Sequence, residues 1–178
     1  MASKKERVFA GFFAALFLLT SSVVAIIAIV AAHQGNSADT STNQSQESNV
    51  NKLQGTKLAN YAPVASIPEL QEIDTTPGTG ATIKPGDTVT VDYTGAVANT
   101  GVIFQSSKDS GQPVPLSLSQ VIAGWSQGIP GMKVGGTRRL MIPAALAYGA
   151  NPPQGSGIPA NADLVFDVTV HSDGDKKQ

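Results

Sequence analysis

The sequence contains no cysteine and only two histidines, His33 and His171. The lack of cysteine excludes disulfide bonds, zinc–thiolate sites and a thiol nucleophile. The two histidines lie far apart in the sequence, which argues against a histidine zinc site and a Ser-His-Asp triad. We therefore expect neither a metal site nor hydrolytic chemistry.

Charged residues are also scarce. They make up 14% of the chain, and the formal net charge is −1. A protein that binds nucleic acid needs a basic surface to neutralise phosphates, and the sequence has no basic stripe. The composition therefore argues against a nucleic-acid partner.

Residues 8–32 form one uncharged, mainly apolar run of about 25 residues. A helix needs about 20 such residues to cross the hydrocarbon core, whereas the core of a signal peptide usually has about 7 to 15. The run therefore predicts a transmembrane signal-anchor in the lipid bilayer. Cleavage after Ala32 is an open alternative, because Val30 and Ala32 are small enough for a signal-peptidase site, and it would give a secreted protein.

Basic residues predict the orientation of this anchor. Lys4, Lys5 and Arg7 precede the apolar run, and the next basic residue is Lys52. The positive-inside rule therefore makes residues 1–7 a cytoplasmic basic N-terminus and places the C-terminal domain outside the cytoplasm.

Residues 33–63 are rich in Ser, Thr, Asn and Gln. Such a segment cannot bury enough apolar surface to offset its ordering entropy, so we expect a disordered linker. At the other end of the chain, residues 173–178 are expected to form a flexible polar tail.

Residues 64–172 have the composition of a folded domain, with alternating apolar residues interrupted by Gly and Pro. The alternation predicts strands at residues 70–74, 88–93, 101–104, 138–142 and 164–170. A helix of about two turns is expected between Ser119, which can cap its start, and Gly128. A helix this short must pack on the sheet, so the fold class is α+β with a sheet of about five strands.

Several motifs of this domain occur in a characteristic order. They are Val91-Asp92-Tyr93-Thr94-Gly95, Phe104-Gln105-Ser106-Ser107, Val121-Ile122-Ala123-Gly124-Trp125, Gly135-Gly136-Thr137-Arg138-Arg139, Ala147-Tyr148-Gly149 and Ile158-Pro159-Ala160-Asn161-Ala162-Asp163-Leu164-Val165-Phe166. Together the motifs resemble the FKBP-type peptidyl-prolyl cis-trans isomerases. This resemblance implies an antiparallel twisted sheet wrapped around one short helix.

The resemblance also implies an aromatic pocket that binds proline-containing polypeptides. Trp125 would form its floor, Tyr93, Phe104 and Phe166 its walls, and the Tyr148 hydroxyl would donate to a substrate carbonyl. The other implied residues are Gln105, in the catalytic set, and Val121, Ile122 and Ile158, in the apolar lining. The backbone N–H of Ile122 could bind a second carbonyl, because the first N–H groups of a helix have no partner within it.

The chemistry of this family needs no cofactor. Rotation about an X-Pro bond passes through a twisted amide, over a barrier of about 18–20 kcal/mol. An apolar pocket disfavours the planar ground state and can hold the twisted conformer more tightly. The resemblance thus implies an isomerase, with macrolide inhibitors as further ligands, and we expect it to be a monomer. Together with the predicted anchor, it indicates an enzyme that acts on exported or cell-surface proteins.

Two features leave other functions open. Tyr93 and Phe166 would be core residues in any β-rich domain, so the aromatic set alone does not establish a pocket. Gln105 stands where the family usually carries an aspartate, and an amide cannot supply a negative charge. A non-catalytic prolyl-peptide binding module or chaperone, or a structural surface domain with a vestigial pocket, therefore remains an alternative function.

Overall fold

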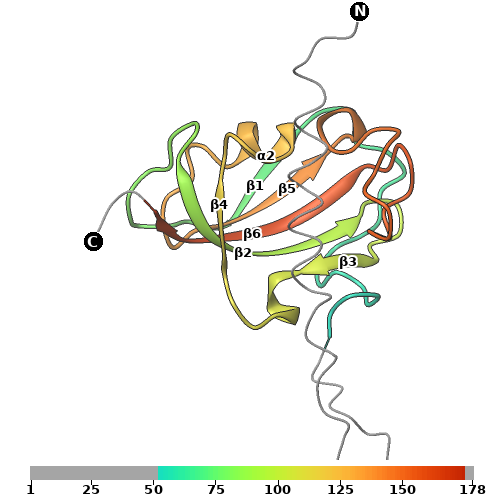
Figure 1. The fold of residues 1–178 in the computed structure, drawn as a ribbon, viewed down its shortest axis with the longest axis horizontal. Helices are drawn as coiled ribbons and strands as arrows, with labels where there is room; N and C mark the ends of the chain where they lie inside the picture. The colour runs from blue at the N-terminus through green and yellow to red at the C-terminus, as the bar shows by residue number, and fades with distance from the viewer. Residues whose placement is uncertain (1–51, 175–178) are drawn as a thin grey trace, which may run out of the picture.

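Alternating apolar residues produce a twisted antiparallel sheet with one short α-helix packed against it (Figure 1). The computed structural model describes residues 52–174. Its elements are β1 (Gln71–Thr76), β2 (Thr88–Val97), β3 (Ile103–Ser106), the 3-10 helix η1 (Ser107–Asp109), β4 (Val114–Ser117), α2 (Ala123–Gly128), β5 (Thr137–Ile142), the 3-10 helix η2 (Ala144–Leu146) and β6 (Leu164–Asp173). The predicted α+β sheet with one short helix is confirmed.

The sheet has six strands instead of about five. Its order is β1-β5-β6-β2-β3, and β4 pairs separately with β2. The additional strand, β4, was not expected because it has only four residues and contains Pro115. Proline lacks an N–H and is therefore found mainly in strands at the edge of a sheet.

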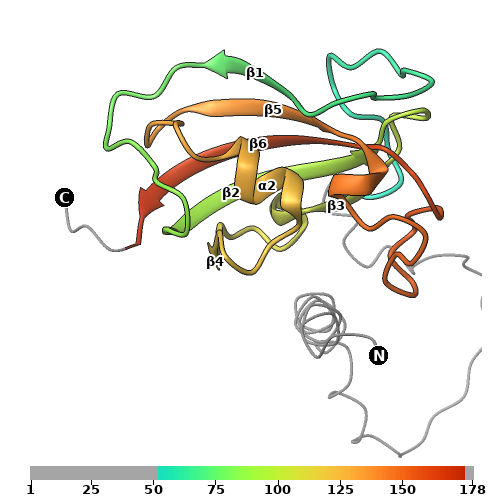
Figure 2. The ribbon, with the colours of Figure 1, turned by 90° about the horizontal axis from the view of Figure 1, so that it is seen from above.

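Helix α2 lies across one face of this sheet (Figure 2). The inward-facing residues of β2, β5 and β6 are buried beneath this helix. They include Val91, Leu140 and Val168, which are 0% exposed. The guanidinium of Arg138 caps the C-terminus of α2, because its Nη1 donates to the Gly128 carbonyl at 2.8 Å. The same Nη1 also donates to Glu72 at 2.7 Å.

The helix begins later than Ser119, the predicted capping residue. It starts at Ala123, and its N-cap, Ile122, is extended and makes no side-chain capping bond. Instead, Ser119 Oγ pairs with Ser117 Oγ at 2.8 Å, and the Gln120 N–H closes a turn on the Ser117 carbonyl at 3.0 Å. Serine favours turns as well as helix caps, and here the turn after β4 uses it.

The ordered domain extends beyond the predicted boundaries at both ends. Residues 52–67, here called the N-terminal strap, cross the face of the sheet opposite α2 (Figure 2). At the other end, Asp173 is the last residue of β6 and is buried, and the Gly174 N–H donates to the Thr88 carbonyl at 2.6 Å. Residues 52–63 and 173–174, which were predicted to belong to the linker and the tail, are therefore part of the folded domain.

The strap is ordered because one end of this outer face is apolar. Leu58 and Ile67 of the strap are buried against a second, smaller core formed by Ala96, Ala98, Ile103, Met141 and Val165. Arg139 adds polar contacts, since its Nη1 donates to the Asn60 carbonyl at 2.7 Å. A few apolar side chains in a polar segment were thus enough to dock it.

Several predictions concern residues that the structure does not describe. The cytoplasmic N-terminus at 1–7, the membrane segment at 8–32, the linker at 33–51 and the tail at 175–178 all lie outside the described residues. Within residues 52–174, no helix is long and apolar enough to cross a membrane.

Candidate active site

A pocket of about 180 Å³ opens between α2, β2, β3, β4 and the segment that follows η2. Its lining residues carry no formal charge. They are Tyr93, Gln105, Pro115, Leu116, Ser117, Gln120, Val121, Ile122, Trp125, Tyr148 and Phe166. A largely apolar cavity with a few neutral polar groups is typical of a site that binds an uncharged part of a ligand.

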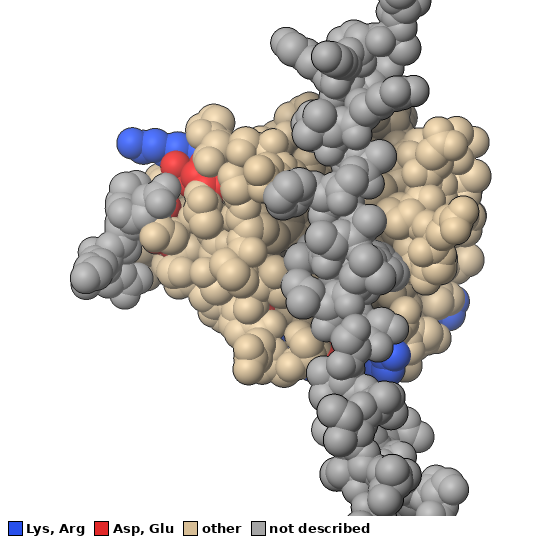
Figure 3. All heavy atoms as spheres, in the orientation of Figure 1, with Lys and Arg blue, Asp and Glu red and all other residues tan. Residues whose placement is uncertain are grey.

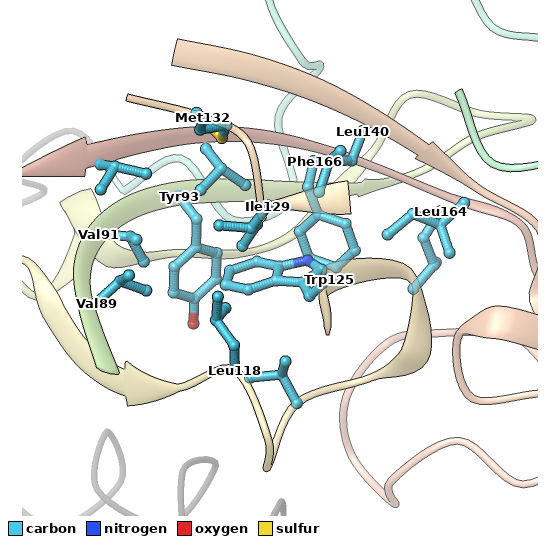
Figure 4. Close-up of a cluster of buried hydrophobic side chains, with 14 of the residues drawn as sticks. Val89, Val91, Tyr93, Leu118, Trp125, Ile129, Met132, Leu140, Leu164 and Phe166 are labelled. Carbon is cyan, nitrogen blue, oxygen red and sulfur yellow. The ribbon is translucent and has the colours of Figure 1, made fainter. Parts of the chain in front are cut away.

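Trp125 lies at the centre of an aromatic cluster (Figure 4). Its ring contacts Tyr93 of β2 edge-on, with centroids 5.4 Å apart, and Phe166 of β6 in the same way at 5.3 Å. Edge-to-face contacts of this kind hold rings in fixed orientations. The indole Nε1 is buried and has no hydrogen-bond partner among the described residues.

Phe104 supports this cluster from behind. It is 4% exposed, and its ring meets Phe166 edge-on with centroids 5.7 Å apart. Gly95 allows this contact, because a Cβ at that position would lie 2.6 Å from Phe166 Cε1 and 2.7 Å from Phe104 Cζ. The glycine of the second strand is therefore required for the shape of the pocket wall.

Burial raises the pKa of both tyrosine hydroxyls of the site. Desolvation raises the pKa of Tyr93 to about 12. Desolvation also raises the pKa of Tyr148, and the neighbouring Tyr93 adds to this effect. Both phenols are neutral at physiological pH, as an ordinary tyrosine also is, and can act as hydrogen-bond donors.

Two polar groups of pocket-lining residues have no hydrogen-bond partner within residues 52–174. The Gln105 side-chain amide makes no hydrogen bond within that range, and the Ile122 N–H donates to no acceptor there. Ile122 instead accepts, through its carbonyl, from the Trp125 N–H at 2.9 Å. Gln105 and the Ile122 N–H are thus candidate partners for the polar groups of a ligand.

The loop carrying Tyr148 is fixed at its base. Asp163 Oδ1 accepts from the Ala144 N–H at 2.8 Å, at the start of η2. The Gly149 N–H donates to the Ala144 carbonyl at 2.9 Å, and the Gly149 carbonyl accepts from the Asn161 N–H at 2.7 Å. These bonds hold Tyr148 at the pocket.

Comparison with known proteins identifies the family of this fold and site. The family model of the FKBP-type peptidyl-prolyl cis-trans isomerases matches residues 80–171. The chain belongs to the FKBP-type peptidyl-prolyl cis-trans isomerase family. By its class it is therefore an isomerase, as the sequence resemblance indicated.

Individual FKBP-type relatives agree with this assignment. A probable FK506-binding protein of Corynebacterium glutamicum is 47% identical over 112 residues, which cover 62% of this chain and 92% of that protein. A peptidyl-prolyl cis-trans isomerase of Saccharomyces cerevisiae, FPR2, is 50% identical over 88 residues, 48% of this chain and 64% of that protein. A crystal structure of a Pseudomonas syringae peptidyl-prolyl cis-trans isomerase superimposes with a TM-score of 0.52 at 33% identity, over 58% of this chain and 74% of that one.

Most of the predicted FKBP site residues lie together in the structure. The pocket brings together Tyr93, Gln105, Val121, Ile122, Trp125, Tyr148 and Phe166. Two predicted residues do not line it: Phe104 lies behind Phe166, and Ile158 is 8% exposed within the main core.

Sequence reasoning missed one wall of the pocket. Pro115, Leu116 and Ser117 come from β4, and Gln120 comes from the turn before α2. The alternation of Val114 and Leu116 was the available signal, but it spans only four residues.

Charged side chains are also sparse on one face of the domain. Outside the grey atoms, the face drawn in Figure 3 carries Lys, Arg, Asp and Glu only towards its margins. No group of His, Cys, Asp or Glu among residues 52–174 is arranged to hold a metal ion. The chemistry that the described site supports is therefore that of neutral groups.

Proposed function

We propose that this pocket accelerates rotation about X-Pro bonds in exported or cell-surface polypeptides. The observation that carries the proposal is the buried Trp125 ring, held edge-on between Tyr93 and Phe166 in a pocket without charge. A proline ring is compact and apolar, and it fits a floor of this kind. The family to which the chain belongs supports the same reaction.

The environment of the pocket favours the twisted amide. A planar amide has more charge separation than a twisted one, so removal from water costs the ground state more than the transition state. The apolar lining supplies this difference, because Val121 and Trp125 are only 8% and 5% exposed. Neither an acid, a base nor a metal takes part in the proposed step.

The neutral donors orient the substrate. We assign the Tyr148 hydroxyl and the Ile122 N–H to carbonyl groups on either side of the prolyl bond. Gln105 would contact the peptide through its amide, which donates as well as accepts. A carboxylate at that position would only accept, so Gln105 changes the hydrogen bonding of this rim.

An isomerisation assay with the whole chain and a short proline-containing peptide tests the proposal. We expect a rate above the uncatalysed background, inhibition by a macrolide such as FK506, and a clear loss of kcat/KM in Tyr148→Phe. Tyr61→Phe is the matched control, because the Tyr61 hydroxyl donates to the Ala98 carbonyl at 2.9 Å, on the outer face. A correctly folded chain without acceleration would reject the catalytic proposal.

Gln105 also favours a second candidate function, a prolyl-peptide binding module or chaperone without turnover. If the missing carboxylate is needed for rate and not for binding, peptides will bind without accelerated isomerisation. Trp125 is the only tryptophan of the chain, so its fluorescence reports binding directly. Saturable binding together with a background rate would support this function, and restored turnover in Gln105→Asp would identify the cause.

We further propose that residues 8–32 anchor the domain outside the cytoplasm. The motivation is the uncharged apolar run that follows Lys4, Lys5 and Arg7. Protease added to intact cells or spheroplasts should then digest the domain while it remains in the membrane fraction. Recovery from the medium with an N-terminus after Ala32 would support cleavage, and protection from protease in intact spheroplasts would contradict export.

A further inference from the structure

The N-terminal strap is attached at both ends to segments that carry pocket residues. Near its beginning, Asp109 accepts from the Leu53 N–H at 2.6 Å and from the Gln54 N–H at 3.0 Å. At its other end, Asp163 Oδ2 accepts from the Ile67 N–H at 2.7 Å. Neither carboxylate lines the pocket, so both can act only through the segments that they hold.

The first attachment holds the segment that carries Gln105. The strap pairs with the outer edge of β3, where the Gly55 N–H donates to the Ile103 carbonyl and the Ile103 N–H donates to the Thr56 carbonyl, both at 2.8 Å. Asp109 ends η1, six residues further on. The strap is therefore hydrogen-bonded to this segment at Ile103 and at Asp109, and Gln105 lies between these two residues.

The second attachment holds the segment that carries Tyr148. Asp163 bonds the strap through Oδ2 and the Ala144 N–H through Oδ1, so a single carboxylate joins the strap to the start of η2. Tyr148 is the second residue after η2. The same strap thus reaches both Gln105 and Tyr148 through short chains of hydrogen bonds.

We propose that the strap positions the two polar sides of the prolyl pocket, with Asp109 and Asp163 as positioning residues. Asp109 sets the place of Gln105, and Asp163 sets the place of Tyr148. The inference rests on the proposed function for its catalytic readout. It also makes a prediction for peptide binding that holds in the absence of turnover.

Single substitutions in the whole chain provide the test. We expect Asp109→Ala and Asp163→Ala each to reduce kcat/KM by about threefold or more, since small displacements of binding groups are costly in a preorganised site. Asp109→Asn should recover part of the loss, because its amide oxygen still accepts one N–H. Glu69→Ala is the matched control, since Glu69 is exposed and makes no side-chain hydrogen bond or ion pair within residues 52–174.

Two measurements separate positioning from loss of folding. The folded fraction of each variant is determined by circular dichroism, and kcat and KM are measured where the chain is fully folded. If the two residues act through one strap, the double variant should lose less than the product of the single effects. Gly55→Ala, which strains the strap at φ +88 without meeting any atom within 4 Å, should lower kcat/KM in the same direction.

The outcomes are decisive for the strap even if catalysis is absent. If the unmodified chain shows no turnover, the catalytic proposal fails, and the Kd for a prolyl peptide, measured by Trp125 fluorescence, replaces kcat/KM as the readout. Fully folded Asp109→Ala and Asp163→Ala variants with unchanged kcat/KM and Kd would overturn the inference. Losses that follow the unfolded fraction alone would overturn it as well.

Discussion

At the scale of single residues, the pocket depends on a glycine as much as on its aromatic rings. Gly95 lies opposite Gln105 in the β2–β3 pair, directly beside Phe104 and Phe166. The rings can meet edge-on only because no side chain occupies this place. One small residue therefore connects the strand pairing to the shape of the aromatic wall.

Substitution of this glycine should damage both stability and binding. The new methyl group in Gly95→Ala would overlap the Phe104 and Phe166 rings, and overpacking of this kind costs about 1–3 kcal/mol. We expect a lower free energy of unfolding in urea and weaker peptide binding by Trp125 fluorescence. Gly111→Ala is the control, because its φ of +70 strains the loop but nothing lies within 4 Å. Equal peptide affinity in the two variants would contradict this role of Gly95.

Tyr93 should make the protein sensitive to alkali. Its pKa in the folded state is about 12, above the usual value of 10 in an unfolded chain. Between these values the unfolded state has released the proton and the folded state has not, so stability falls as pH rises, by about 2–3 kcal/mol across the interval. Below pH 10 both states keep the proton, so the ionisation of Tyr93 causes no loss of stability there.

The measurement is the free energy of unfolding as a function of pH. The curve for the unmodified chain should decline above pH 10, and Tyr93→Phe should decline less. Tyr61→Phe is a matched control on the outer face, where burial also raises the pKa but leaves the ring more exposed. Identical slopes for Tyr93→Phe and the unmodified chain would exclude Tyr93 as the source.

Most residues of the pocket could be named from the sequence because the family motifs contain them. Tyr93, Trp125 and Phe166 were predicted and lie in contact. Phe104 and Ile158 were predicted with them and are buried in the same core, but they are not among the residues that line the pocket. Sequence position does not distinguish a side chain at the surface of a cavity from one packed beside it. That distinction depends on packing depth, which only the structure supplies.

At the scale of elements, the strap is the part of the fold that the sequence did not predict. Its polar composition is typical of a linker, and its docking depends on a few residues such as Leu58 and Ile67. Many of its other contacts use its backbone groups, as in the pairing of residues 55 and 56 with Ile103. Backbone pairing leaves little trace in side-chain patterns, and β4 was missed for a similar reason.

Removal of one strap side chain should therefore destabilise the domain. Leu58 is 7% exposed, and truncation of a buried leucine costs about 2–5 kcal/mol because a cavity remains. We expect Leu58→Ala to lower the midpoint of urea unfolding clearly. Gln54→Ala should leave it nearly unchanged, because Gln54 is exposed and uses only its backbone N–H. If this segment were a disordered linker, neither substitution would change the midpoint. An unchanged midpoint in Leu58→Ala would therefore contradict the docked strap.

At the scale of the whole molecule, charge is arranged away from the site. The chain has a net charge of −1, and the pocket lining contains no ionised group. The described arginines are used in structural pairs, such as Arg139 with Asp167 at 2.7 Å and Arg138 with Asp74 at 2.6 Å. Long-range electrostatic attraction of a charged substrate therefore has little source near the pocket.

This arrangement predicts that kcat/KM hardly depends on ionic strength. Salt screens exposed charges over about 10 Å at 0.1 M, so a site without charge has little interaction to lose. For a peptide with a glutamate beside the proline, we expect nearly equal kcat/KM at low and high sodium chloride. Gln120→Lys places a cation at the rim and should make kcat/KM for this peptide fall as salt increases, while an uncharged peptide stays unaffected. Gln54→Lys, on the strap, is the matched control for net charge, and a salt dependence as strong there as at Gln120 would mean that overall charge, not the neutral rim, governs the encounter.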